Sequence, residues 1–378
     1  MRLIRSGAAA LLLCSLAACG GPRDAPLPAN DTGSTPAAPQ ADPVQPKPDA
    51  ATPSAGIDCS RAASAAERAI CADPVLVELD AAMAAAWQAA LSRSDDHDAL
   101  RADQRAWLAQ RDACAEQHNA RACLRARYAI RNAVLGGVLG GPFSWAGKWQ
   151  RLRGEGLFEL TPEPGGKAYA VKLDASSGSH TGVLDQARAT PDGDHLLRVA
   201  NTGDGAACRL ELRRVANQIE LVEIDSAYEC GAAAMGVTFA GRYARSDVAQ
   251  VQWTLLTRDL AATADADARV RNLLGNDAYA RLVDTCQLVS QDDATPGLVT
   301  CGVRGLFTLM EAALQQQGDA VRAALIVDDE VHWWSSDPAT AAAPPPWFDA
   351  WRKRFADKPV RLMSQPGTPL LTDAPHGR

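Results

Sequence analysis

The sequence lacks the local motifs that mark the common catalytic and metal sites. It contains no Gly-x-Ser-x-Gly turn, no Walker phosphate loop and no His-Glu-x-x-His pair. It also has no Cys-x-x-Cys pair, and its six histidines are scattered, which disfavours a zinc site. Carboxylates are plentiful, but no pattern marks the acid pair of a glycosidase. We therefore expect a protein that is not an enzyme and that needs no cofactor and no metal.

The first 18 residues have the pattern of a secretory signal peptide. Arg2 and Arg5 precede a short apolar run, which is too short for a permanent membrane span. The ending Leu16-Ala17-Ala18-Cys19 resembles the lipobox of bacterial lipoproteins, and this resemblance implies that Cys19 is lipidated and becomes the first mature residue. In that family the residues after the cysteine sort the protein between membranes, and the resemblance implies that Gly20-Gly21 favours the outer membrane, facing the periplasm. The alternative is an ordinary signal peptidase site with a free Cys19.

Large apolar side chains are almost absent from residues 19–56. Such a Pro-, Ala- and Asp-rich segment buries too little surface to offset the entropy of ordering, so we expect a disordered tether. The whole chain has a formal net charge of -7, and loss of Arg2 and Arg5 with the leader lowers this to -9. An acidic, exported protein is a poor candidate for nucleic-acid binding, and we expect none.

The cysteine count fits an oxidising compartment. Ten cysteines, less Cys14 in the leader and Cys19 at the lipid site, leave eight, an even number that predicts four disulfides. Their grouping pairs Cys208 with Cys230 and Cys286 with Cys301. The first four allow three connectivities. Of these we favour the local one, which joins Cys59 to Cys71 and Cys114 to Cys123. These four are Cys59, Cys71, Cys114 and Cys123.

Residues 57–139 have the pattern of a compact helical bundle. Ser64 and Glu67 form a capping box, and Asp73 followed by Pro74 marks the start of a second helix. Short connections between amphipathic helices place them antiparallel. The apolar face of the second helix comprises Leu76, Leu79, Met83, Trp87 and Leu91.

This stretch resembles the LprI-like N-terminal domain of bacterial envelope lipoproteins, over roughly a fifth of the chain. Trp87 departs from the family, which more often has Tyr there. The family is named after a lipoprotein described as a lysozyme inhibitor, so the resemblance implies inhibition of host or competitor muramidases, but it transfers no inhibitory residue. The residues that carry it are Asp58, Cys59, Glu67, Ile70, Cys71, Asp73, Leu76, Leu79, Asp80, Leu100, Gln104, Trp107, Arg111, Cys114, Cys123, Leu124, Tyr128 and Arg131.

Three polar residues fall on the apolar sides of these helices. Asp80 and Arg111, together with Gln104, occupy positions where an unpaired charge is costly. We expect Asp80 and Arg111 to form a partly buried ion pair that fixes helix register. The alternative is a role in ligand contact.

Beyond Gly140-Gly141 the apolar period changes from helical to two. Eight short strands between residues 142 and 246 predict a closed or nearly closed antiparallel barrel. Residues 248–378 mix elements and predict a small α+β module. Within it we expect helices at 265–274, 277–289, 306–317 and 347–355, a strand at 298–303 and a hairpin formed by 321–327 and 331–335.

The sequence thus predicts an α+β multidomain protein with a disulfide-linked helical bundle, a small barrel and a C-terminal α+β module. The function that we expect is that of an envelope-anchored lipoprotein that occludes the cleft of a lysozyme or another cationic muramidase without covalent chemistry. A non-catalytic scaffold or binding module of the envelope is the first alternative, and a cryptic cell-wall hydrolase is the second. The lipid anchor makes the membrane a further partner.

Overall fold

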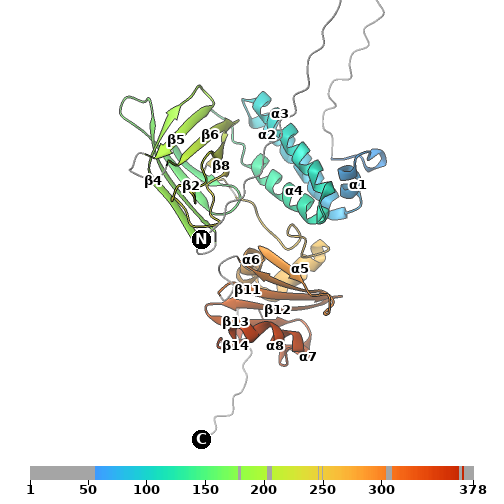
Figure 1. Cartoon of the computed structure of the whole chain (residues 1–378). Helices are drawn as coiled ribbons and strands as arrows, with labels where there is room; N and C mark the ends of the chain where they lie inside the picture. Colours follow the sequence, from blue (N-terminus) through green and yellow to red (C-terminus); the bar gives the residue numbers. More distant parts are fainter. Residues whose placement is uncertain are drawn as a thin grey trace, which may run out of the picture. The chain divides into compact units, whose positions relative to one another are not determined.

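The structure, a computed structural model, describes residues 56–177, 180–201, 207–245, 247–248, 250–303, 309–365 and 368–369. The expected signal peptide, the lipidation site Cys19 and the tether up to residue 55 lie outside this part of the chain. The described residues form, in succession, a disulfide-linked group of helices, a closed barrel and a mixed helix and sheet region (Figure 1). The predicted α+β multidomain class is therefore confirmed.

The helices begin and end at the residues that their capping signals mark. The Ser64 hydroxyl accepts a hydrogen bond from the Glu67 N–H, and the Glu67 carboxylate accepts one from the Ser64 N–H, which completes the capping box. Asp73 caps the following helix, with Pro74 in its first turn. The elements are η1 (Cys59–Arg61), α1 (Ala65–Cys71), α2 (Pro74–Arg93), α3 (His97–Asp112), η2 (Ala113–Glu116) and α4 (Ala120–Gly136).

The helical core is formed by apolar side chains that recur at helical spacing. Leu76, Met83 and Trp87 of α2 pack with Leu124 and Tyr128 of α4 in one buried cluster. Among the described helices, α2 is also the one long and apolar enough to meet the length and composition of a membrane span. Since it supplies core residues to the bundle, its apolar character has a structural explanation within the fold.

Eight antiparallel strands close into a barrel in sequence order, because β1 pairs with both β2 and β8. Burial alternates along the strands, so that Phe158 and Leu160 of β2 point inward while Leu157 and Glu159 point outward. The interior is a packed core of apolar side chains centred on aromatic residues such as Trp149. The strands are β1 (Gly147–Arg151), β2 (Gly156–Pro162), β3 (Tyr169–Ser177), β4 (His180–Pro191), β5 (Leu196–Asn201), β6 (Arg209–Val215), β7 (Gln218–Glu223) and β8 (Gly241–Arg245).

The C-terminal region is one sheet with helices on both faces (Figure 1). Helices α5 (Ala264–Leu274) and α6 (Asn276–Thr285) pack on one face, in a cluster that includes Trp334. Helix α8 (Pro346–Arg352) and η3 (Lys353–Phe355) pack on the other, against Trp333. The short α7 spans Pro338–Ala341. The sheet order is β15 (Thr368–Pro369), β14 (Val360–Gln365), β13 (Glu330–Ser335), β12 (Ala320–Val327), β11 (Glu311–Gln317), β10 (Leu298–Gly302) and β9 (Leu288–Gln291).

Two of the predicted helices in this region are wrong in whole or in part. Residues 311–317 form the central strand β11, between β10 and β12, instead of the helix expected over 306–317; residues 306–308 lie outside the described part. Helix α6 ends at Thr285, not at Val289, because Leu288 and Val289 begin the edge strand β9. In both places sheet pairing overrides helical propensity.

Four disulfides join the described cysteines. Cys208–Cys230 and Cys286–Cys301 form in the barrel and in the C-terminal region. Among the first four cysteines the local connectivity is present, with the bonds Cys59–Cys71 and Cys114–Cys123. Each bond therefore closes a short loop within one region of the fold.

Candidate functional site

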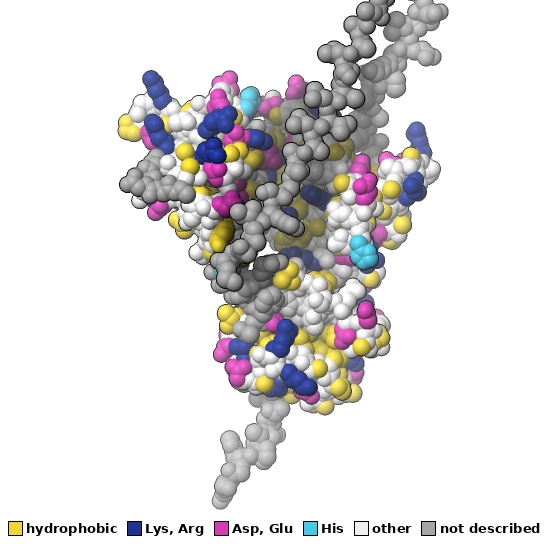
Figure 2. Space-filling view, in the orientation of Figure 1, with side chains coloured by type: hydrophobic (Ala, Val, Ile, Leu, Met, Phe, Trp, Pro, Cys, Tyr) yellow, Lys and Arg dark blue, Asp and Glu magenta, His cyan; other side chains and the backbone are white. Residues whose placement is uncertain are grey.

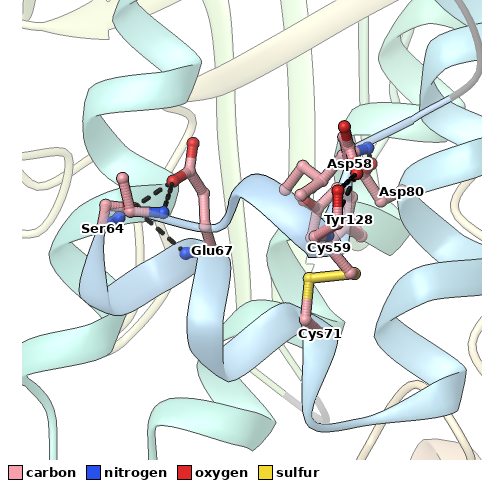
Figure 3. The surroundings of a disulfide bond; sticks show 10 residues. Asp58, Cys59, Ser64, Glu67, Cys71, Asp80 and Tyr128 are labelled. Carbon is pink, nitrogen blue, oxygen red and sulfur yellow. Dashed lines mark hydrogen bonds between the residues drawn. A yellow bond between two sulfur atoms is a disulfide. The ribbon is translucent and has the colours of Figure 1, made fainter.

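In the helical region, a buried set of hydrogen bonds surrounds Asp80 of α2. Its carboxylate is 2% exposed and accepts hydrogen bonds from the Tyr128 hydroxyl at 2.7 Å and from the Ile57 N–H at 2.6 Å. Figure 3 shows Asp80 and Tyr128 next to the residues around the Cys59–Cys71 disulfide. Burial and the Asp80 carboxylate raise the pKa of Tyr128, so its hydroxyl remains a proton donor at neutral pH. Asp80 thus joins α2, α4 and the segment that enters η1.

Arg111 of α3 has a different partner from the one that the sequence suggested. In the part of the chain that the structure describes, no direct ion pair joins Arg111 to Asp80; the guanidinium binds the neighbouring Asp112 at 2.7 Å instead. It lies near enough to Tyr128 to oppose part of the rise in the pKa of that residue. The two charges therefore approach the same tyrosine from different helices, and this tyrosine takes the place of the expected ion pair.

Gln104 belongs to a second set of contacts, between α3 and α4. Its side-chain oxygen accepts a hydrogen bond from Arg131 Nε at 2.8 Å, and Arg131 also forms an ion pair with Asp103 at 2.6 Å. The guanidinium groups of Arg111 and Arg131 each lie 5.7 Å from the ring centroid of Trp107. Cation–π contacts and the Trp107–Tyr128 edge contact at 5.4 Å thus connect the two sets.

We did not expect from the sequence that Tyr128 and two arginines are buried and join the helices. Arg125 is 2% exposed and forms an ion pair with Asp73 at 2.9 Å, which ties α4 to the N-cap of α2. Arg131 is 3% exposed. The available signal was helical spacing, since Leu124, Tyr128 and Arg131 recur at steps of three and four on one face of α4.

These contacts form a polar core that links α2, α3 and α4. Every described cysteine is in a disulfide, so no described thiol is free to act as a nucleophile. The described residues also contain no group of three or more His, Cys, Asp or Glu placed to hold a metal ion. The arrangement fixes the relative position of α2, α3 and α4, and so presents their outer faces as a preformed surface.

The described residues also form a cavity elsewhere, in the C-terminal region. It has a volume of about 970 Å³ and lies between α6 and strands β12 to β14. Leu274, Trp334 and Met363 supply apolar walls, while His332 and Arg361 add polar groups. Burial lowers the pKa of His332, so its imidazole is neutral at pH 7. The size is that of small-molecule sites in proteins.

By fold, the chain is a disulfide-linked multidomain α+β protein whose N-terminal region is a four-helix domain with a fixed polar core. Residues 59–140 of this region match the family described as lysozyme inhibitor LprI. The match confirms the resemblance that the motifs of this segment indicate.

Curated relatives also match part of the chain. Lipoprotein LprI of Mycobacterium bovis is 35% identical over 86 residues, which are 22% of this chain and 43% of the relative. Lipoprotein LprI of two Mycobacterium tuberculosis strains gives the same values. The chain therefore spans less than half the length of the relatives that it matches. No solved structure matches the chain.

Proposed function

We propose that this protein is an envelope lipoprotein that inhibits lysozyme-type muramidases by binding non-covalently and covering the enzyme's cleft. The observation that carries the proposal is the match of residues 59–140 to the lysozyme inhibitor LprI family. The fixed polar core around Asp80 and Tyr128 supports it, because a rigid surface loses little conformational entropy on binding. Four disulfides suit an extracytoplasmic compartment.

The proposal includes the placement of the protein. Cys19 carries the lipid anchor, residues 19–56 form the tether, and the anchored protein faces the periplasm from the outer membrane. The expected domains are the helical domain at 57–139, the barrel at 142–246 and the α+β module at 248–378. The formal net charge of -7 favours encounter with a cationic enzyme.

The test is inhibition of muramidase activity by the purified full chain. We expect activity of at least one of the c-, g- and i-type lysozymes to fall in a saturable manner, with a dissociation constant in the submicromolar to micromolar range. An unrelated acidic protein of similar net charge is the control for nonspecific charge effects. Absence of inhibition with all three enzyme types contradicts the proposal.

One observation favours the alternative of an envelope binding module. The cavity of about 970 Å³ in the C-terminal region is large enough for a small ligand. A binding module without inhibitory activity would leave all three lysozymes active while the purified protein still retained a small molecule detectable by native mass spectrometry.

A further inference from the structure

The outer face of the barrel carries a hollow across four neighbouring strands. In the register of the sheet, Gln150 of β1 pairs with Leu157 of β2, Leu157 with Asp174 of β3, and Asp174 with Val183 of β4. These four side chains therefore form one row across the sheet. The hollow has a volume of about 580 Å³, and Gly156 and Ala175 also line it. It has room for a long side chain of another protein.

Two apolar side chains border this hollow in an exposed position. Leu157 is 41% exposed and Val183 is 49% exposed, which places both among the most exposed large hydrophobic residues of the described chain. Each lies one strand away from Asp174, so the two apolar groups are separated by roughly 10 Å, twice the spacing between strands. An aliphatic chain that enters between them loses contact with water on both sides.

The charge of the hollow has one sign. Asp174 and Glu155 are its charged residues, and both are carboxylates. Glu155 is held by the Ser176 hydroxyl, whereas Asp174 is exposed and has no hydrogen bond or ion pair to any described residue. We name the residues Glu155, Leu157, Asp174 and Val183 the acidic groove.

The neighbouring outer surface of the barrel is different. On β4 to β6, three exposed arginines are matched with acids, in the ion pairs Arg188–Glu163, Arg198–Asp192 and Arg209–Asp225. Figure 2 shows basic and acidic side chains next to one another over this part of the barrel. Charges that are already paired contribute little to binding a partner. The unpaired Asp174, which lies between two apolar groups, can still form an ion pair with one.

We propose that the acidic groove docks a lysine or arginine side chain of a cationic protein partner. The aliphatic stem of this side chain lies between Leu157 and Val183, and its charged end meets Asp174 and Glu155. The identification of the partner as a lysozyme-type muramidase rests on the proposed function. The groove adds to that function a docking surface on the barrel, outside the segment that matches the LprI family.

The test compares charge reversal at two exposed aspartates of the full chain. Asp174→Lys changes the groove, and the control Asp194→Lys makes the same charge change at an exposed residue of the β4–β5 turn, outside the groove. The probe is a c-type lysozyme, with association measured at low and at moderate ionic strength. We expect Asp174→Lys to slow association about tenfold at low salt and to flatten its salt dependence, and Asp194→Lys to have little effect.

A second variant tests the apolar part. Leu157→Ser with Val183→Ser keeps every charge, and we expect lysozyme to dissociate roughly fivefold faster from it. The groove proposal is overturned if Asp174→Lys and Asp194→Lys have equal effects, or if lysozyme dissociates from the Ser variant at the unchanged rate. The proposed function still stands in that case, provided that the unmodified protein inhibits lysozyme.

If the unmodified protein does not bind lysozyme, the groove is tested directly. N-acetylarginine amide is added to the full chain, with the uncharged N-acetylcitrulline amide as its matched control. We expect the methyl NMR signals of Leu157 and Val183 to shift with the arginine compound and much less with citrulline. Equal shifts, or none, overturn the groove proposal independently of the proposed function.

Discussion

Asp80 illustrates how a buried charge is accommodated in the helical region. A carboxylate that is 2% exposed is costly to bury unless donors satisfy it, and here the Tyr128 hydroxyl and the Ile57 N–H do so. The tyrosine hydroxyl is a neutral donor, so the charge is stabilised without an ion pair. The contact also holds the residues before η1 against α2.

Replacement of Tyr128 by Phe tests this contact. The ring and its packing remain, but Asp80 loses one of its two donors, so we expect the free energy of unfolding to fall by roughly 1 to 3 kcal/mol. Tyr228→Phe is the matched control, because Tyr228 is 53% exposed and its hydroxyl loss should be nearly neutral. Urea unfolding measures both, and similar values for the two variants would contradict the assigned role of Tyr128.

Asp337 provides a prediction about pH. Its carboxylate accepts hydrogen bonds from Arg322 and from the Ala339 N–H, and these lower its pKa below the ordinary value of 3.8. A carboxyl group with a lowered pKa in the folded state stabilises the protein above its unfolded pKa, and this contribution disappears as the pH falls through the folded pKa.

We therefore expect Asp337→Asn to lower the urea midpoint at neutral pH and the difference from the unmodified protein to shrink as the pH falls below about 4. Asparagine can still cap α7, so the change removes the charge and its interaction with Arg322 while it keeps the helix cap. The exposed and unpaired Asp194→Asn serves as the control. A difference that stays constant down to acidic pH would show that the Asp337 charge has no such effect.

At the scale of secondary-structure elements, the sequence predicts best where the signal is local. The capping box at Ser64 and Glu67, the helix start at Pro74 and the alternation of the barrel strands depend on near neighbours, and all are present. Pairing of the cysteines within short stretches follows the same principle. The LprI-type motifs are also local, since the family match covers residues 59–140 and includes neither the barrel nor the C-terminal region.

Prediction fails where distant strands decide the structure. The sequence Glu311-Ala-Ala-Leu-Gln-Gln-Gln has high helical propensity, yet it is buried on both faces between two sheet neighbours. Its Ala312 and Leu314 pack with the α5 and α6 side, and Ala313 packs with the α8 side. In the candidate site, helical spacing placed Asp80, Gln104 and Arg111 on inward faces, but their partners depend on how the helices rotate against each other.

The disulfides give a prediction at this scale. Cys114–Cys123 ties η2 to α4 inside the segment that matches the inhibitor family, whereas Cys286–Cys301 ties the end of α6 to β10. Replacing both cysteines of either pair by Ala should lower stability by about 2 to 4 kcal/mol. We expect the Cys114/Cys123 variant to lose inhibition of muramidase at temperatures where the Cys286/Cys301 variant retains it.

Circular dichroism shows whether each disulfide variant is folded under the assay conditions. If both variants are folded and only the Cys286/Cys301 variant loses inhibition, the inhibitory surface does not lie in the helical domain.

At the scale of the whole molecule, each of the three regions has its own apolar core and at least one disulfide. The crosslinks restrict the unfolded state and so add to the stability that each core provides. The segment that matches the LprI family is thus combined with two further regions, each with a core of its own.

Inhibition of a lysozyme-type muramidase by this protein, as we propose, is measured by a titration of muramidase activity with the purified full chain. We expect saturable inhibition that is retained by Asp194→Lys and weakened by loss of the Cys114–Cys123 bond. Full muramidase activity at every protein concentration, with c-, g- and i-type lysozymes alike, would contradict it.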